Sequence, residues 1–182
     1  MKHLTFVIFA FFFSNLFSQG QQFTSVIPKK HSAAEKFSLL NSTNDTIITF
    51  VREDNIRNIK INENNYILKK SKILFNSNED TVAFYKGKRI FFPSQNIVVS
   101  EKKKKNGWDY YLDNDKILEI NYTYDKKEKN YHITASTEEL NELTAGLLQL
   151  GLGRFDKRVS IEYDNDDNDF TTMLITILVL TL

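Results

Sequence analysis

The chain ends with "DNDDNDFTTMLITILVLTL", residues 164–182, where an acidic run gives way to thirteen residues without a charged side chain. As an α-helix, residues 170–182 would be about 20 Å long, which is short of the roughly 30 Å hydrocarbon core of a bilayer. Three destinations are open: a membrane, a strand buried on both faces of a sheet, and a helix through the centre of a β-barrel. The rest of the chain has to decide among them.

The middle of the chain has the sequence pattern of a β-sheet. Short segments rich in β-branched and aromatic residues alternate with turn-forming pieces, at 46–51, 58–61, 66–75, 81–87, 88–92, 96–100, 108–112, 116–124 and 131–136. Within 116–124 the alternation predicts that Leu118, Ile120, Tyr122 and Tyr124 face the core. This spacing predicts a mainly β fold, an antiparallel meander that closes into a barrel of about nine to twelve strands, with a sandwich as the alternative.

A helix signal follows these strands in "STEELNELTAGLLQLGLG", residues 136–153. Ser136 and Glu139 have the spacing of a capping box, and the leucines at 140, 143, 147 and 150 recur at helical intervals. We expect a capped helix near 137–150, ended by Gly151 or Gly153. Residues 157–164 read as one more strand.

The barrel supplies the destination we favour for the C-terminal segment. A helix that is apolar on every side must be buried on every side, and its height matches a strand of about six residues. Asp166, Asp167 and Asp169 would lie at the positive end of its dipole, with Asp169 as the N-cap. The sequence therefore predicts a buried apolar helix at 170–182, with a membrane anchor as the runner-up.

The N-terminus reads as an export signal. Lys2 precedes an apolar run of about ten residues, and small and polar residues follow at 18–20. The segment resembles signal peptides of Bacteroidetes-type bacteria. We expect a signal peptide at 1–18, a polar lead-in at 19–44 with a short helix at 33–40 as an option, and a single β-rich domain at 45–182. The expected destination is the periplasm, the cell envelope or the medium.

The amino-acid composition limits the kinds of chemical site that the chain can form. The absence of cysteine excludes disulfides and thiolate sites, and 24 basic against 23 acidic residues argues against bulk binding of nucleic acid, although a local patch remains open. His132 lacks a histidine partner at metal-binding spacing. The run starting at Asp164 fails as a calcium loop, because Asp169 replaces the required glycine and Ile175 the required glutamate. We expect no catalytic residue, metal or cofactor.

One cluster could contact a ligand. Lys102, Lys103, Lys104 and Lys105 precede an Asn-Gly turn, and lysine clusters attract anionic lipid. A solvated hairpin tip is the plainer interpretation of the same lysines.

Two stretches give the chain a family resemblance: "GWDYYLDNDKILEINYTYDKKEKNYHI" and "LGRFDKRVSIEYDNDDNDFTTMLITILVLTL". Aromatic strands followed by an acidic stretch and an apolar C-terminal segment resemble the tubby-like fold that phospholipid scramblases share. The resemblance covers residues 45–182 and implies a twelve-stranded barrel around a hydrophobic helix. The leucine helix at 137–150 departs from the pattern, and no phosphoinositide-binding motif can be carried over.

These observations favour an exported, non-catalytic β-rich domain with a binding or scaffolding role in the cell envelope. The alternative is a membrane-associated protein held by its C-terminal segment, which binds anionic lipid through Lys102–Lys105. Membrane lipid and another envelope protein are the two partners left open.

Overall fold

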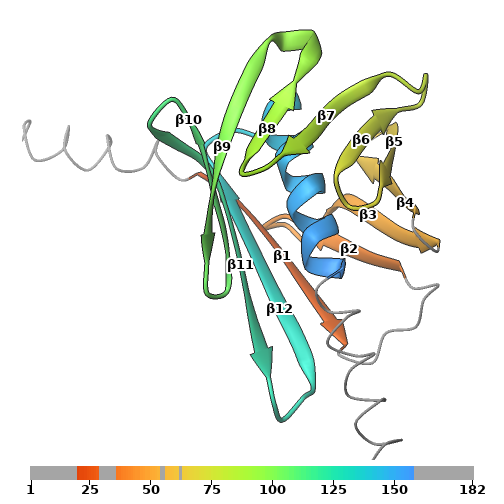
Figure 1. The fold of residues 1–182 in the computed structure, drawn as a ribbon. Coiled ribbons are helices and arrows are strands. Elements are labelled where there is room, and N and C mark those ends of the chain that lie inside the picture. Colours follow the sequence, from red (N-terminus) through yellow and green to blue (C-terminus); the bar gives the residue numbers. More distant parts are fainter. Residues whose placement is uncertain (1–19, 29–35, 54–55, 62, 158–182) are drawn as a thin grey trace, which may run out of the picture.

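The computed structural model describes residues 20–28, 36–53, 56–61 and 63–157. The described chain forms a closed antiparallel barrel in which each strand pairs with its neighbours in sequence, and one helix, residues 142–157, runs through it (Figure 1). The strands are β1 (Gln21–Pro28), β2 (Lys36–Leu40), β3 (Thr46–Glu53), β4 (Ile56–Ile61), β5 (Asn64–Lys69), β6 (Ile73–Asn76), β7 (Thr81–Lys86), β8 (Arg89–Phe92), β9 (Ile97–Lys104), β10 (Gly107–Leu112), β11 (Asp115–Asp125) and β12 (Asn130–Thr137), with a 3₁₀ turn η1 (Pro93–Gln95) between β8 and β9. The predicted mainly β barrel is confirmed.

Strand β1 closes the barrel. It pairs along its whole length with β12, from Gln21 opposite Thr137 to Pro28 opposite Asn130, and it meets β2 at Thr24 and Leu40. The sequence places β1 and β2 in the expected polar lead-in, so the barrel begins at residue 21 and not at 45. The optional helix at 33–40 is wrong, because Lys36–Leu40 is a strand.

Side chains alternate between the inside and the outside of the barrel, as the period of a strand requires. In β11, Leu118, Ile120 and Tyr122 are buried, which confirms the predicted core face. Tyr124 is 37% exposed, because the β11–β12 hairpin extends beyond the barrel there (Figure 1). Its ring packs against Tyr131 at 4.9 Å between centroids.

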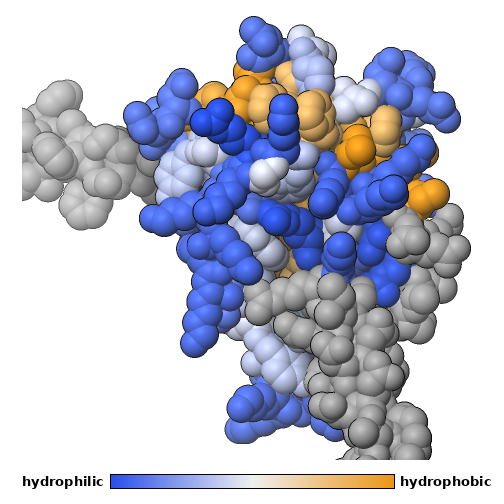
Figure 2. Space-filling view, viewed as in Figure 1, coloured by the Kyte–Doolittle hydropathy of each residue, from blue (hydrophilic) through white to orange (hydrophobic). Residues whose placement is uncertain are grey.

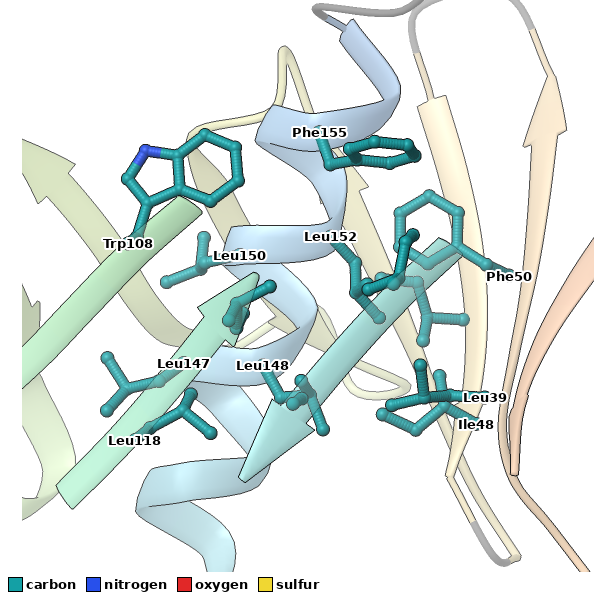
Figure 3. Packing of buried hydrophobic residues seen from close by; sticks show 14 of the residues in the cluster. Leu39, Ile48, Phe50, Trp108, Leu118, Leu147, Leu148, Leu150, Leu152 and Phe155 are labelled. Atoms are coloured by element: carbon teal, nitrogen blue, oxygen red, sulfur yellow. The ribbon is translucent and has the colours of Figure 1, made fainter. Parts of the chain in front are cut away.

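The helix at 142–157 fills the barrel interior. Leu147, Leu148, Leu150 and Leu152 are 0% exposed, and these side chains point in different directions around the helix axis (Figure 3). Burial on every side is what an all-round apolar helix requires. The helix predicted near 137–150 is therefore confirmed as a helix, at 142–157, and its place inside the barrel is a finding that the sequence did not predict. The predicted buried helix 170–182 and residues 158–164 of the predicted strand lie outside the described residues, and Lys157 belongs to the helix.

The boundaries of this helix differ from the prediction. Ser136 belongs to β12, and the cap is formed by Asn141 and Thr144, whose side chains each accept a hydrogen bond from the other's backbone N–H at 3.0 Å. Gly151 and Gly153 do not end the helix, which continues to residue 157. They let it approach the wall: a Cβ at Gly153 would lie 2.1 Å from Leu68 Cδ2.

The predicted strand at 66–75 is two strands. Lys70 and Ser71 both have positive φ, at 53° and 52°, and the Lys72 N–H donates to the Lys69 carbonyl at 3.0 Å. This is a two-residue type I′ hairpin turn, which joins β5 to β6.

Candidate functional site: a basic end of the barrel

Basic side chains gather at one end of the barrel. The β5–β6, β7–β8, β9–β10 and β11–β12 turns lie there, because alternate turns of an antiparallel meander share an end (Figure 1). These turns and the strand ends beside them carry Lys69, Lys70, Lys72, Lys86, Lys88, Arg89, Lys102, Lys103, Lys104, Lys105, Lys126, Lys127 and Lys129. Asp125 and Glu128 are the acidic residues of the fourth turn. We call this surface the basic end.

The opposite end is acidic. Its turns and the residues beside them carry Asp45, Glu63, Glu79, Asp80, Asp113, Asp115, Glu138, Glu139 and Glu142. The described residues of the turns themselves include no lysine or arginine, and two lysines, Lys60 and Lys116, lie in the strands beside them. A chain with a formal net charge of +1 is thus strongly polarised along the barrel axis. Such a charge distribution steers anions toward one end and away from the other.

A cavity of about 300 Å³ opens at the basic end. Two hairpins and the last described turns of the helix form its walls, which consist of Lys70, Ser71, Lys72, Tyr85, Gly87, Arg154 and Lys157. We call it the anion pocket. Three lysines and one arginine converge on it, and none of its lining residues is acidic.

The β5–β6 turn presents its side chains to the pocket at a conformational cost. Type I′ turns favour Asn-Gly, because both central residues need positive φ, yet this turn has Lys70 and Ser71. A non-glycine residue in that region is disfavoured by about 1 kcal/mol or more. Ser71 is 3% exposed, and its Oγ has no hydrogen-bond partner within the described part of the chain. A buried hydroxyl without a partner at a basic cavity is an unused donor for an anion.

Arg154 is held at the pocket by a polar network inside the barrel. Its guanidinium pairs with Glu101 and lies over the Tyr85 ring, 4.6 Å from the ring centroid. The Tyr85 hydroxyl donates to Glu101 at 2.6 Å and lies 3.3 Å from the Tyr110 hydroxyl. Burial, together with the negative charge of Glu101, raises the pKa of Tyr85 and Tyr110 well above the ordinary tyrosine value. Both phenols therefore keep their protons, and Glu101 offsets part of the charge of Arg154.

Asp156 fixes the end of the helix that carries Arg154 and Lys157. Its carboxylate, 1% exposed, accepts hydrogen bonds from Arg52 Nη2 at 2.8 Å and from Arg57 Nε at 2.8 Å. These arginines belong to β3 and β4, so the ion pairs tie the helix to the wall. The position of the two cations at the pocket follows from this anchor.

The lysines predicted as lipid contacts lie at the basic end but outside the anion pocket. Lys102, Lys103 and Lys104 belong to β9, and Lys105 is in the turn that follows. The Lys104 amine is occupied, because it pairs with Asp109 at 2.8 Å and with Glu119 at 2.5 Å. The other three are exposed.

The pocket residues were missed in the sequence. "KKSK" at 69–72 interrupts two apolar runs and could have indicated a turn, but it lacks the glycine or asparagine that usually marks one. Arg154 follows the glycines predicted to end the helix, and Lys157 opens the predicted strand at 157–164, whereas both belong to the helix in the structure. No sequence pattern links residues 70 and 154, since only barrel closure brings them together.

An apolar row crosses the outer surface of β6 to β9, from Ile73 beside the basic β5–β6 turn to Val98 beside the β8–β9 turn. Ile73, Phe84, Phe91 and Val98 are consecutive cross-strand neighbours on β6 to β9. Ile73 is 37% exposed and Val98 43%, and the two rings stack 5.4 Å apart. Figure 2 shows apolar side chains gathered over this part of the barrel.

Among the described residues no group of three or more potential metal ligands occurs, and His132 is an exposed residue of β12. No helix within this part of the chain has the length and apolarity to cross a bilayer. The rejected calcium loop at 164–175 lies outside the described residues.

Comparisons with family models, with curated protein sequences and with solved structures give no match to this chain.

Proposed function

We propose that the protein is an exported, non-catalytic binding domain whose anion pocket holds a phosphate-type group of its ligand. The observation that carries this proposal is the convergence of Lys70, Lys72, Arg154 and Lys157 on one cavity of about 300 Å³. Lysine binds phosphate as a mobile point charge, and Ser71 adds a hydroxyl donor. The volume is at the lower end of the range for small-molecule sites, which suits one anionic group.

The pocket is better suited to binding than to catalysis. Tyr85, its one titratable neutral group, has a pKa raised well above the ordinary value by burial and by its neighbours, so it is no base near neutral pH. The lysines line the cavity without a carboxylate or histidine among the lining residues that could take a proton from a nucleophile. Export rests on the predicted signal peptide at 1–18.

A second candidate function is association with an anionic membrane. The apolar row of Ile73, Phe84, Phe91 and Val98 begins beside the basic β5–β6 turn, and Lys102, Lys103 and Lys105 belong to the same basic end. Exposed apolar side chains beside lysines provide both contributions of peripheral lipid binding. Here the phosphate group would belong to a lipid headgroup and not to a free molecule.

One experiment distinguishes the two sources. Titration calorimetry with inorganic phosphate, pyrophosphate and glycerol 3-phosphate measures the binding of soluble ligands. Co-sedimentation measures binding to vesicles that are either neutral or contain about 30% anionic lipid, which gives the membrane a strongly negative surface. The test variant is the double substitution Lys70→Gln with Lys72→Gln. The control is Lys126→Gln with Lys127→Gln, which removes the same charge from the basic end outside the pocket.

The proposal predicts that a soluble phosphate compound binds, that the pocket variant weakens binding at least tenfold, and that the control changes it less than threefold. Equal losses in the two variants would show diffuse attraction and refute a defined pocket. Binding to anionic vesicles alone, lost on Val98→Ser, would favour the membrane function.

We also infer a distant relationship to the tubby-like fold. Twelve antiparallel strands in a closed barrel support it, since the resemblance implied that number, although the helix inside this barrel, residues 142–157, is the one that departs from the family pattern. An experimental structure that superposes strand by strand on that fold would establish the relationship, and a different strand register would reject it.

A further inference from the structure

A second depression, with different chemistry, lies at the acidic end. It has a volume of about 570 Å³ and is formed by the β4–β5 and β6–β7 turns and the start of the helix. Its lining is rich in amides and consists of Ile61, Asn64, Asn65, Tyr66, Asn76, Ser77, Asn78, Val82, Leu140, Asn141, Glu142 and Ala145. We call it the amide cleft.

Two of its asparagines shape the cleft. Asn76 Oδ1 accepts hydrogen bonds from the backbone N–H groups of Asn78 and Asp80, at 3.0 and 2.9 Å, and so fixes the β6–β7 turn. Asn141 caps the helix through its Oδ1. Because these two side chains hydrogen-bond to the backbone of their own turns, they hold the walls of the cleft in place.

Three other amides are available to a ligand. Asn64, Asn65 and Asn78 are exposed, and their side chains make no hydrogen bond to another described residue. Each amide offers two N–H donors and one oxygen acceptor. Such groups match pairs of neighbouring hydroxyls, which also donate and accept.

The cleft also has a surface for the apolar face of a ligand. Tyr66 is half-buried, and Val82, Leu140 and Ala145 pack against the core beside it. Burial and the charge of Glu142 raise the pKa of Tyr66, which keeps its phenol protonated. Glu142 and the acidic turns around the cleft disfavour an anionic ligand.

The cleft continues onto the outside of the barrel. A neighbouring depression of about 540 Å³, over β3 to β5, shares Asn65, Tyr66 and Ser77 with it. The two depressions adjoin through these residues and together form a trough, whose outer part is also lined by Lys36 and Lys60. A trough of this kind suits a chain of several units better than a single small molecule.

We propose that the amide cleft and this adjoining depression bind an uncharged, hydroxyl-rich chain, that is, a neutral oligosaccharide. The free amides contact hydroxyl pairs, and Tyr66 with the apolar residues contacts the C–H face of a sugar ring. A peptide added as an extra strand is disfavoured at this site, because β3 to β7, which lie beneath it, are each paired on both sides. This site is separate from the anion pocket and does not depend on it.

The test uses the purified protein with neutral hexasaccharides: maltohexaose, cellohexaose, laminarihexaose and mannohexaose. Saturation-transfer NMR detects binding, and calorimetry gives the dissociation constant. The test variant is Asn65→Ala with Asn78→Ala, and the control is Asn114→Ala, an exposed asparagine of another turn at the same end. Circular dichroism and the melting temperature verify that each variant is folded.

We expect at least one neutral hexasaccharide to bind, the double variant to weaken binding tenfold or more, and the control to bind like the wild type. Hexagalacturonate, an acidic chain of similar length, should bind at least tenfold more weakly. The proposal is overturned if no neutral hexasaccharide binds at millimolar concentration, if the double variant binds normally, or if an uncharged hexapeptide binds as tightly as the sugars.

Discussion

Replacing Leu150 by alanine tests whether the barrel depends on its internal helix. The side chain is 0% exposed and lies in the part of the core that also contains Trp108 (Figure 3). A buried Leu→Ala change costs about 2–5 kcal/mol, more when the surroundings cannot collapse into the cavity. Here the wall is a closed, hydrogen-bonded barrel, and the helix already touches it at Gly151 and Gly153. We therefore expect about 4 kcal/mol, in the upper part of that range.

Urea unfolding followed by Trp108 fluorescence measures this loss, because Trp108 is the single tryptophan and is buried at 4% exposure. Leu143→Ala is the matched control, since Leu143 belongs to the same helix but is only partly buried. The Leu143→Ala change should lower the free energy of unfolding by about 1–2 kcal/mol, because the Leu143 side chain buries less apolar surface on folding than Leu150 does. If Leu150→Ala cost no more than Leu143→Ala, the helix would not be the core of the barrel.

Three further outcomes follow. Asp156→Ala should cost about 3–5 kcal/mol in a urea titration, because it removes a buried carboxylate shared by Arg52 and Arg57, and a loss below 1 kcal/mol would contradict that role. A chain ending at Lys157 should keep the circular dichroism and melting temperature of the barrel, since residues 142–157 already fill it; an unfolded product would count against this. Glu119 has its pKa lowered from 4.5 to about 2, first by hydrogen bonds from Lys104 and Lys116. Its contribution is complete above pH 4.5 and is lost as the pH falls toward 2, so Glu119→Gln should remove about 1 kcal/mol of acid-dependent stability after allowance for solvent screening; unchanged acid melting would argue against it.

Most strands from Thr46 onward could be predicted because they have a local signal; the exception is the break between β5 and β6. Alternation in β11 and β12 and the Asn-Gly turn before Trp108 need no tertiary information. Strand β1 was missed although Phe23, Ser25 and Ile27 alternate inward, because its pairing with β12 joins residues more than one hundred positions apart. The alternation within a single strand that is flanked by polar residues is a weak local signal. It does not outweigh the interpretation of the segment as a polar lead-in.

The identity of the interior helix could not be settled from hydrophobicity alone. Two segments were apolar enough, and the more strongly apolar one was favoured. Residues 142–157 contain three buried polar side chains, Thr144, Gln149 and Asp156. These residues lower the average hydrophobicity of the segment, so the average argues against its burial. Their partners explain it: Thr144 takes part in the cap, and Asp156 meets two arginines of the wall.

The anion pocket could not be predicted from the sequence either, because only the folded chain brings its residues together. Its cationic residues come from the β5–β6 turn and from the end of the helix, which are more than eighty positions apart. The local sign was a strained turn, and the strain becomes visible only once φ is known at Lys70 and Ser71. The four consecutive lysines at 102–105 drew attention because they are adjacent in sequence, whereas the converging cations are not.

The most direct test is a crystal of the protein soaked with tungstate, a phosphate analogue located by its anomalous scattering. We predict a single strong peak in the anomalous map of the anion pocket, in contact with Lys72 and the Ser71 hydroxyl, that disappears when excess phosphate is added. A pocket without a peak, while tungstate binds elsewhere at the basic end, would contradict the account.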